Sequence, residues 1–133
     1  MKRIRNKKTS VDSSELAHIC AEYLWEKQGG KIRILDVREL TDIADFFIIA
    51  SANSMIHLNS LAEIVKEVFD RYDVPKYHIE GLKGTGWVLA DAYDVIVHLF
   101  LDEIREYYDI ESYWGDAPFE IMKDFEHETN IAN

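Results

Sequence analysis

Two apolar runs separated by a short polar segment place the strongest constraint on how this chain can fold. Trp87 to Ala90 is followed by Asp-Ala-Tyr-Asp at positions 91–94 and then by Val95 to Leu101. Trp, Val, Ile, Leu and Phe dominate both runs, and such residues suit a pleated, partly buried surface. The pattern predicts a β-hairpin. The second run is apolar except for His98, which indicates an interior strand covered on both faces.

A helix is predicted directly after the hairpin, in the sequence DEIREYYDIESYW. Asp102 is placed to act as its N-cap. Three Tyr and one Trp fall between Tyr107 and Trp114. Aromatic residues of this kind are frequent in binding hot spots, and packing against the sheet is the alternative role.

The N-terminal half of the chain predicts two helices around a pair of strands. Asp12 and Glu15 have the spacing of a capping box before an amphipathic helix that ends near Gly29-Gly30. KIRILDVRE and ADFFIIAS predict two neighbouring strands. Asn53-Ser54 can cap a long helix through Arg71, in which Leu61 and Val65 lie on the apolar face.

The complete order of elements predicts the fold class. KYHIE indicates a further short strand, and residues 119–128 indicate a last short helix. Strands that are interspersed with helices predict an α/β two-layer fold with a mixed sheet of about five strands and helices packed on it. At 133 residues the chain is one domain in length. We divide it into a basic disordered tail (1–11), a folded domain (12–117) and a helical tail (118–133).

The charge distribution favours a basic protein partner. The net charge is −10, and the first eight residues contribute +5, so the remainder carries −15 (−10 minus 5). A body this acidic repels phosphate, so we expect little direct nucleic-acid contact. A single cysteine, the lack of a membrane-length apolar run and the lack of a secretion signal indicate a cytoplasmic protein that does not contact membranes.

The chain shows little sign of catalytic or metal chemistry. Its five histidines are scattered through separate elements and form no zinc-ligand spacing. His98 is expected to be a core histidine with one satisfied nitrogen, and a buried switch or ligand is the alternative. Asp91 and Asp94 could bind a metal or act as a general base, but they flank a turn, where Asp is used for local backbone hydrogen bonds. We therefore predict no catalytic residue, no metal and no cofactor.

Several segments together resemble the ribosomal silencing factor family (RsfS, also called iojap). They are LTDIADFFIIASANS, HIEGL, WVLADAYDVIVHLF and REYYDIESYWGDA, and the similarity runs roughly from Leu35 to Ala117. The resemblance implies a nucleotidyltransferase-like fold without the active site. It also implies binding to ribosomal protein L-fourteen on the large ribosomal subunit, which blocks joining of the small subunit and silences translation. Tyr93 stands where the family usually has a glycine, and Ala52-Asn53 stands where it has another.

The predicted docking surface lies on the first strand of the hairpin. Trp87, Leu89 and Asp91 point to one side of an extended strand, whereas Val88 and Ala90 point to the other. If helices cover the Val88 side, the first three offer an aromatic anchor, an aliphatic neighbour and a carboxylate to a basic partner. The predicted partner-binding residues are Trp87, Leu89, Asp91, Tyr93, Asp94, Arg105 and Tyr108. Alternatively, Trp87 belongs to the core. An exposed aromatic surface would also suit a homodimer.

The resulting interpretation is a translation regulator rather than an enzyme. A large-subunit assembly factor is the first alternative, because silencing and assembly would use the same docking surface. The second alternative is a metal-dependent, nucleotidyltransferase-like enzyme that uses Asp91 or Asp94.

Overall fold

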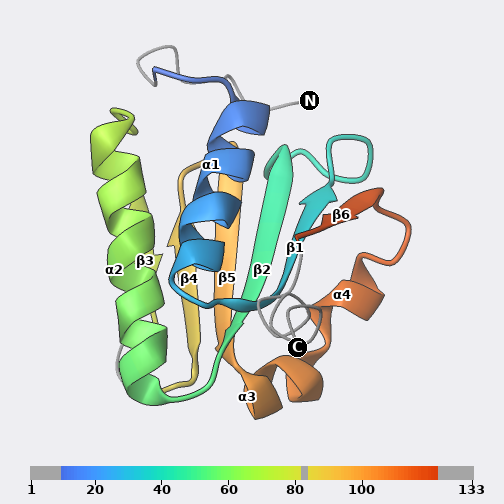
Figure 1. Ribbon diagram of the computed structural model, residues 1–133. Helices are drawn as coiled ribbons and strands as arrows, with labels where there is room; N and C mark the ends of the chain where they lie inside the picture. Colours follow the sequence, from blue (N-terminus) through green and yellow to red (C-terminus); the bar gives the residue numbers. More distant parts are fainter. Residues whose placement is uncertain (1–9, 82–83, 123–133) are drawn as a thin grey trace, which may run out of the picture.

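The protein folds into a mixed β-sheet with helices on both faces (Figure 1). The computed structural model describes residues 10–81 and 84–122. In chain order the elements are α1 (Ser13–Glu26), β1 (Gly30–Asp36), β2 (Phe46–Ala52), α2 (Met55–Arg71), β3 (His78–Glu80), β4 (Trp87–Asp91), β5 (Val95–Leu101), α3 (Asp102–Tyr108), α4 (Ile110–Tyr113) and β6 (Phe119–Ile121). The predicted fold class is therefore confirmed. In the described ranges, none of the helices has the length and apolar character needed to cross a membrane.

The sheet has six strands in the order β3-β4-β5-β2-β1-β6, one more than the expected five. β2 and β5 pair in parallel at its centre, and the other neighbouring pairs are antiparallel. The β4–β5 hairpin and the neighbouring β1 and β2 were both predicted correctly. β5 is buried along its length except at Leu101, as its apolar sequence predicts.

The additional strand is β6, which replaces the start of the helix predicted over 119–128. Phe119 pairs with Leu35 and Ile121 pairs with Arg33 across the open edge of β1. Phe119 and Ile121 alternate with Glu120, so the segment also fits the two-residue period of a strand. Pairing with β1 outweighs the local helical pattern because it satisfies backbone groups along that edge. The remainder of the predicted helix, 123–128, lies outside the described residues.

Side-chain caps begin the two long helices as the sequence predicts. The Asp12 carboxylate accepts a hydrogen bond from the Glu15 N–H (2.8 Å), and the Glu15 carboxylate accepts one from the Asp12 N–H (3.2 Å). The Ser54 hydroxyl accepts from the His57 N–H at the start of α2 (3.1 Å). At α3 the prediction was wrong by one residue. Asp102 is the first helical residue, and the N-cap is Leu101, which makes no side-chain capping bond.

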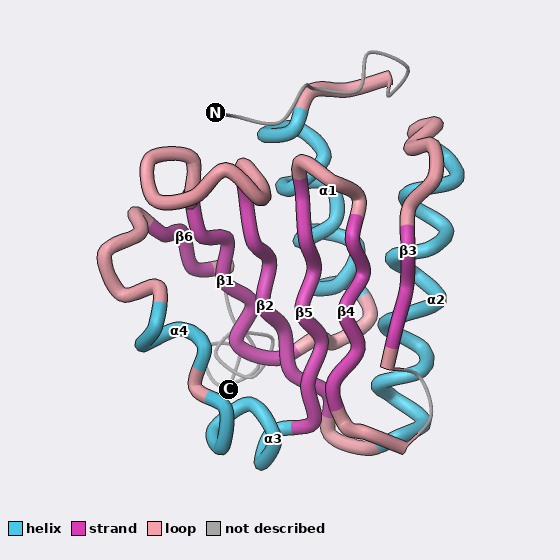
Figure 2. The backbone as a smooth tube through the Cα atoms, turned by 180° about the vertical axis from the view of Figure 1, so that it is seen from behind, coloured by secondary structure: helices cyan, strands magenta, loops and turns pink. Residues whose placement is uncertain are grey.

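The two faces of the sheet carry different layers. α1 and α2 lie side by side over the first face (Figure 1), where Leu61 and Val65 are fully buried in the larger core cluster. The second face, seen in Figure 2, carries the short α3 and α4 at one end. Phe47, Ile49 and Phe100 form a smaller core cluster beneath them. The two short helices leave part of β4 and β5 uncovered toward the 91–94 turn, within the described part of the chain.

Candidate docking surface on the second face of the sheet

Strand β4 presents alternate side chains to the two faces, as predicted. Val88 and Ala90 are completely buried beneath α1 and α2. Trp87 and Leu89 are half-buried and pack against the smaller cluster on the opposite face. In the hairpin register, Trp87 lies opposite Phe100, Leu89 opposite His98, and Asp91 opposite Ile96. The side of β4 that was predicted to bind a partner is therefore the side that the long helices leave uncovered.

Aromatic side chains from α3 extend this uncovered side. The Trp87 ring packs on Phe100 (ring centroids 5.0 Å apart) and on Tyr108 (4.8 Å). Tyr108 is 50% exposed, and the Tyr107 ring next to it is 79% exposed. We call Trp87, Leu89, Tyr107 and Tyr108 the aromatic surface. Tyr107 was not among the predicted partner-binding residues, although the run of tyrosines after the hairpin was the signal that could have identified it.

His98 lies under the aromatic surface and contacts Trp87 directly. The Trp87 Nε1–H donates a hydrogen bond to His98 Nδ1 (3.3 Å), so the imidazole is neutral with its proton on Nε2. Among the described residues, the buried Nε2 has no hydrogen-bond partner, and such a group costs about 1–3 kcal/mol. Burial lowers the pKa of His98 to about 4. The prediction of a core histidine with one satisfied nitrogen is confirmed.

The hairpin turn uses one of its aspartates as predicted. Asp91 Oδ1 accepts a hydrogen bond from the Tyr93 N–H (2.8 Å). The Asp94 N–H donates to the Ala92 carbonyl (2.9 Å), and Tyr93 between them has φ +68°. These features define a tight γ-turn with positive φ, a strained geometry for a residue with a side chain. Tyr93 thus adopts a positive φ that a glycine would adopt without strain.

Asp94 connects the turn to the sheet through its main chain. Its carbonyl accepts hydrogen bonds from the N–H groups of Asp45 (2.8 Å) and Phe46 (3.1 Å), at the start of β2. Tyr93 lies beside His78 of β3, with ring centroids 6.3 Å apart. The two predicted residues therefore sit at the end of the hairpin away from α3, and the turn does not bring them against Tyr108.

The structure places Arg105 inside the protein, whereas we predicted that it extends the docking surface. It is only 7% exposed. Its guanidinium donates to both carboxylate oxygens of Glu111 (2.9 Å each), to Ser51 Oγ (2.9 Å) and to the Gly30 carbonyl (3.3 Å). These bonds connect α3, α4, β1 and β2. The side chain therefore holds the short helices against the sheet, and its donors are directed into the protein.

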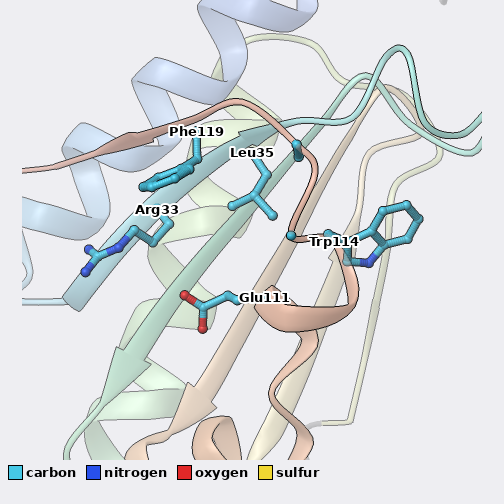
Figure 3. Close-up of a pocket in the computed structure, with 7 residues that line it drawn as sticks. Arg33, Leu35, Glu111, Trp114 and Phe119 are labelled. Atoms are coloured by element: carbon cyan, nitrogen blue, oxygen red, sulfur yellow. The ribbon is translucent and has the colours of Figure 1, made fainter.

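A small hollow lies beside α4 and next to β1 and β6 (Figure 3). Its volume is about 220 Å³, and it is lined by Arg33, Leu35, Glu111, Trp114, Gly115, Ala117 and Phe119. Small-molecule sites typically occupy about 300–1,000 Å³, so the hollow is small for such a ligand. In the described ranges, no group of three or more His, Cys, Asp or Glu side chains could hold a metal ion. The aromatic surface is the better candidate for the functional site.

Long helices cover one face of the sheet, and the second face carries the aromatic surface. The chain belongs to the ribosomal silencing factor family: the family model described as "Ribosomal silencing factor during starvation" matches residues 10–133. This match extends past residue 117, where we had placed the end of the resemblance, and it includes β6.

Two relatives and one solved structure are similar to most of this chain. The ribosomal silencing factor RsfS of Halalkalibacterium halodurans is 32% identical over 108 residues, which are 81% of this chain and 92% of that protein. The mouse "Mitochondrial assembly of ribosomal large subunit protein 1" is 30% identical over 101 residues, 73% of this chain and 44% of that protein. A crystal structure of a Chromobacterium violaceum protein superposes with a TM-score of 0.76 at 30% identity, covering 88% of this chain and 98% of that one.

Proposed function

We propose that this protein is a translation regulator that binds the large ribosomal subunit through ribosomal protein L-fourteen. In that position it blocks joining of the small subunit and silences translation. Membership of the ribosomal silencing factor family supports this function. A regulatory rather than enzymatic role is also supported by Asp91, because one of its carboxylate oxygens accepts the Tyr93 N–H within the turn.

The observation that carries the proposal is the half-buried Trp87 at the centre of the aromatic surface. One part of its ring packs on Phe100 and Tyr108, so it is already ordered before a partner arrives. Aromatic side chains that are ordered in this way lose little conformational entropy on binding and commonly act as hot spots. Burial of Trp87, Leu89 and Tyr108 by the partner would supply affinity.

The charge of the chain supports a basic partner for this surface. The net charge is −10 even though the first eight residues contribute +5. Asp91 lies on the same side of β4 as Trp87. Acidic groups next to an apolar contact orient a basic ribosomal protein and raise its association rate. A chain with this net charge also repels ribosomal RNA, which favours a contact with protein.

A large-subunit assembly factor is the second candidate function. The name of the mouse relative, which refers to assembly of the ribosomal large subunit, favours it. Both functions would use the same surface on the large subunit. Depletion of the protein in its host would separate them, because loss of an assembly factor leaves immature large subunits and loss of a silencing factor leaves mature subunits that join freely.

The proposed function can be tested by co-sedimentation with purified large subunits and with joined ribosomes. The wild-type protein should bind the large subunit alone and should lower the yield of joined ribosomes. Trp87→Ala should weaken binding by ~2 kcal/mol or more, which is about 30-fold. Ile56→Ala is a matched control, because Ile56 is a large apolar residue on α2 that is 84% exposed.

The charge contribution needs a variant that preserves the turn. Asp91→Asn removes the charge but keeps an oxygen that can accept the Tyr93 N–H. Asp91→Lys removes this acceptor and reverses the charge. Both should weaken binding, Asp91→Lys more strongly, and the loss should be greatest at low salt. Glu67→Lys on α2 makes the same charge reversal on the other layer and should bind normally. If Trp87→Ala unfolds the protein and Asp91→Asn binds like the wild type, the docking surface lies elsewhere.

A further inference from the structure

We propose that His98 is a positioning residue for the aromatic surface, holding the Trp87 indole in the orientation that the binding partner meets. This inference rests on the proposed function, because it assumes that Trp87 contacts the partner. His98 itself is buried, so it acts through Trp87 and does not touch the partner.

The geometry gives Trp87 one directional contact among several non-directional ones. Phe100 and Tyr108 contact its ring, and such contacts allow the indole to tilt or flip. The hydrogen bond from Trp87 Nε1–H to His98 Nδ1 (3.3 Å) fixes which edge of the indole faces the sheet. Leu89 lies directly opposite His98 in the register, next to Trp87 on the same face. Fixing the indole in advance reduces the conformational entropy that is lost on docking.

Fold stability alone does not explain why a histidine occupies position 98, because its second ring nitrogen is unsatisfied. Its Nε2 is buried without a hydrogen-bond partner in the described part of the chain. The imidazole stacks near Phe100 and meets the edge of Phe47, with ring centroids 6.2 and 5.2 Å away. A phenylalanine would suit these aromatic neighbours and would remove the unsatisfied Nε2 donor. It would also remove the acceptor of the Trp87 Nε1–H, but Trp87 is half-buried, so its indole can turn toward water. An unsatisfied buried group in a native protein calls for an explanation, and acceptance of the Trp87 bond provides one.

The acceptor role requires the neutral imidazole. A protonated imidazole carries N–H on both nitrogens and cannot accept a bond from the indole. The Trp87, Phe47 and Phe100 rings around His98 carry no charge that could stabilise the protonated form. Burial lowers the pKa of His98 to about 4, so Nδ1 remains an acceptor at neutral pH.

Two substitutions separate the acceptor from the shape of the ring. His98→Phe keeps an aromatic ring but removes the acceptor. His98→Asn is smaller, but its side-chain oxygen can lie near the position of Nδ1. The Trp87 indole N–H resonance, identified by its loss in Trp87→Phe, reports the bond directly through its exchange with solvent.

The expected results differ between the two variants. His98→Phe should melt no lower than the wild type, should expose the indole N–H to rapid exchange, and should bind large subunits about 3- to 10-fold more weakly, the usual effect of one hydrogen bond. His98→Asn should restore slow exchange and most of the binding, even if its smaller side chain lowers the melting temperature.

Two outcomes would overturn the positioning role. One is a folded His98→Phe variant whose indole exchanges rapidly but which binds large subunits as tightly as the wild type. The other is a His98→Phe variant that melts well below both the wild type and His98→Asn, which would assign His98 to stability. A wild-type protein that does not bind large subunits would overturn the proposed function instead, while the exchange measurement would still decide whether His98 orients the indole.

Discussion

Arg105→Met should destabilise the domain without removing any direct contact with the partner. Methionine keeps an unbranched apolar side chain but removes the guanidinium. Four hydrogen bonds are then lost, two of them to the Glu111 carboxylate and the others to Ser51 and Gly30. Because the bonds join α3 and α4 to the sheet, the loss should be felt as a loss of fold stability.

The expected magnitude follows from the burial of the two charged partners. Removing one partner of a fully buried ion pair costs roughly 3–5 kcal/mol. The side chain of Arg105 is 8% exposed, but that of Glu111 is 34% exposed and can regain water when the pair is broken. We therefore expect a loss of about 2–3 kcal/mol, which corresponds to a fall of roughly 10 °C in melting temperature for a domain of this size.

Thermal and urea unfolding of single and double variants would check this value. Glu111→Gln alone should cost less than Arg105→Met, because it leaves a neutral acceptor for the guanidinium. The double variant should lose less than the sum of the two single variants, since the residues share one interaction. If Arg105→Met melts like the wild type but fails to bind large subunits, Arg105 contacts the partner and our reading of its role is wrong.

Three further predictions concern the core, the buried histidine and the turn. Leu61→Ala should lower the free energy of unfolding by roughly 2–5 kcal/mol and Val65→Ala by somewhat less, and unchanged melting curves would show that this face of α2 is not buried. Between pH 6.5 and 4 the unfolded chain binds a proton at His98 that the folded chain does not, because the folded pKa is about 4 and the ordinary value is 6.5. The free energy of unfolding should therefore fall by about 3 kcal/mol as the pH drops through this window. Urea unfolding measured over the same pH range should show a smaller fall for His98→Phe, and an equal fall in both proteins would contradict the prediction. Tyr93→Gly should be more stable than Tyr93→Ala by about 1 kcal/mol, because only glycine adopts φ +68° without strain, and equal melting temperatures would show that the turn relaxes.

Local sequence signals predicted most of the elements. The capping box at Asp12 and Glu15, the Ser54 cap and the apolar β5 all depend on neighbouring residues, so their patterns are legible in the sequence. β6 was missed because its three residues become a strand only by pairing with the open edge of β1. A segment of that length has too few residues for its period to outweigh a helical pattern.

The site could be predicted only where it lies on a regular element. Alternation along β4 correctly placed Trp87 and Leu89 on the face opposite Val88. The role of Arg105 could not be read in the same way. Its partner Glu111 follows a break between α3 and α4, where Asp109 has φ +46°, so the pair does not have the spacing of neighbours on one helix.

The pairing of β1 with β6 also determines when the sheet can be completed during synthesis. β1 is made before the other strands, but its outer edge is paired by residues 119–121, which follow all the other described elements. The parallel contact between β2 and β5 likewise has to wait until α2, β3 and β4 have been made. Non-local strand pairing of this kind slows folding and leaves strand edges temporarily open. A chain truncated after Pro118 would keep the edge beside Ile34 permanently unpaired, and we expect it to aggregate more readily than the chain that includes β6.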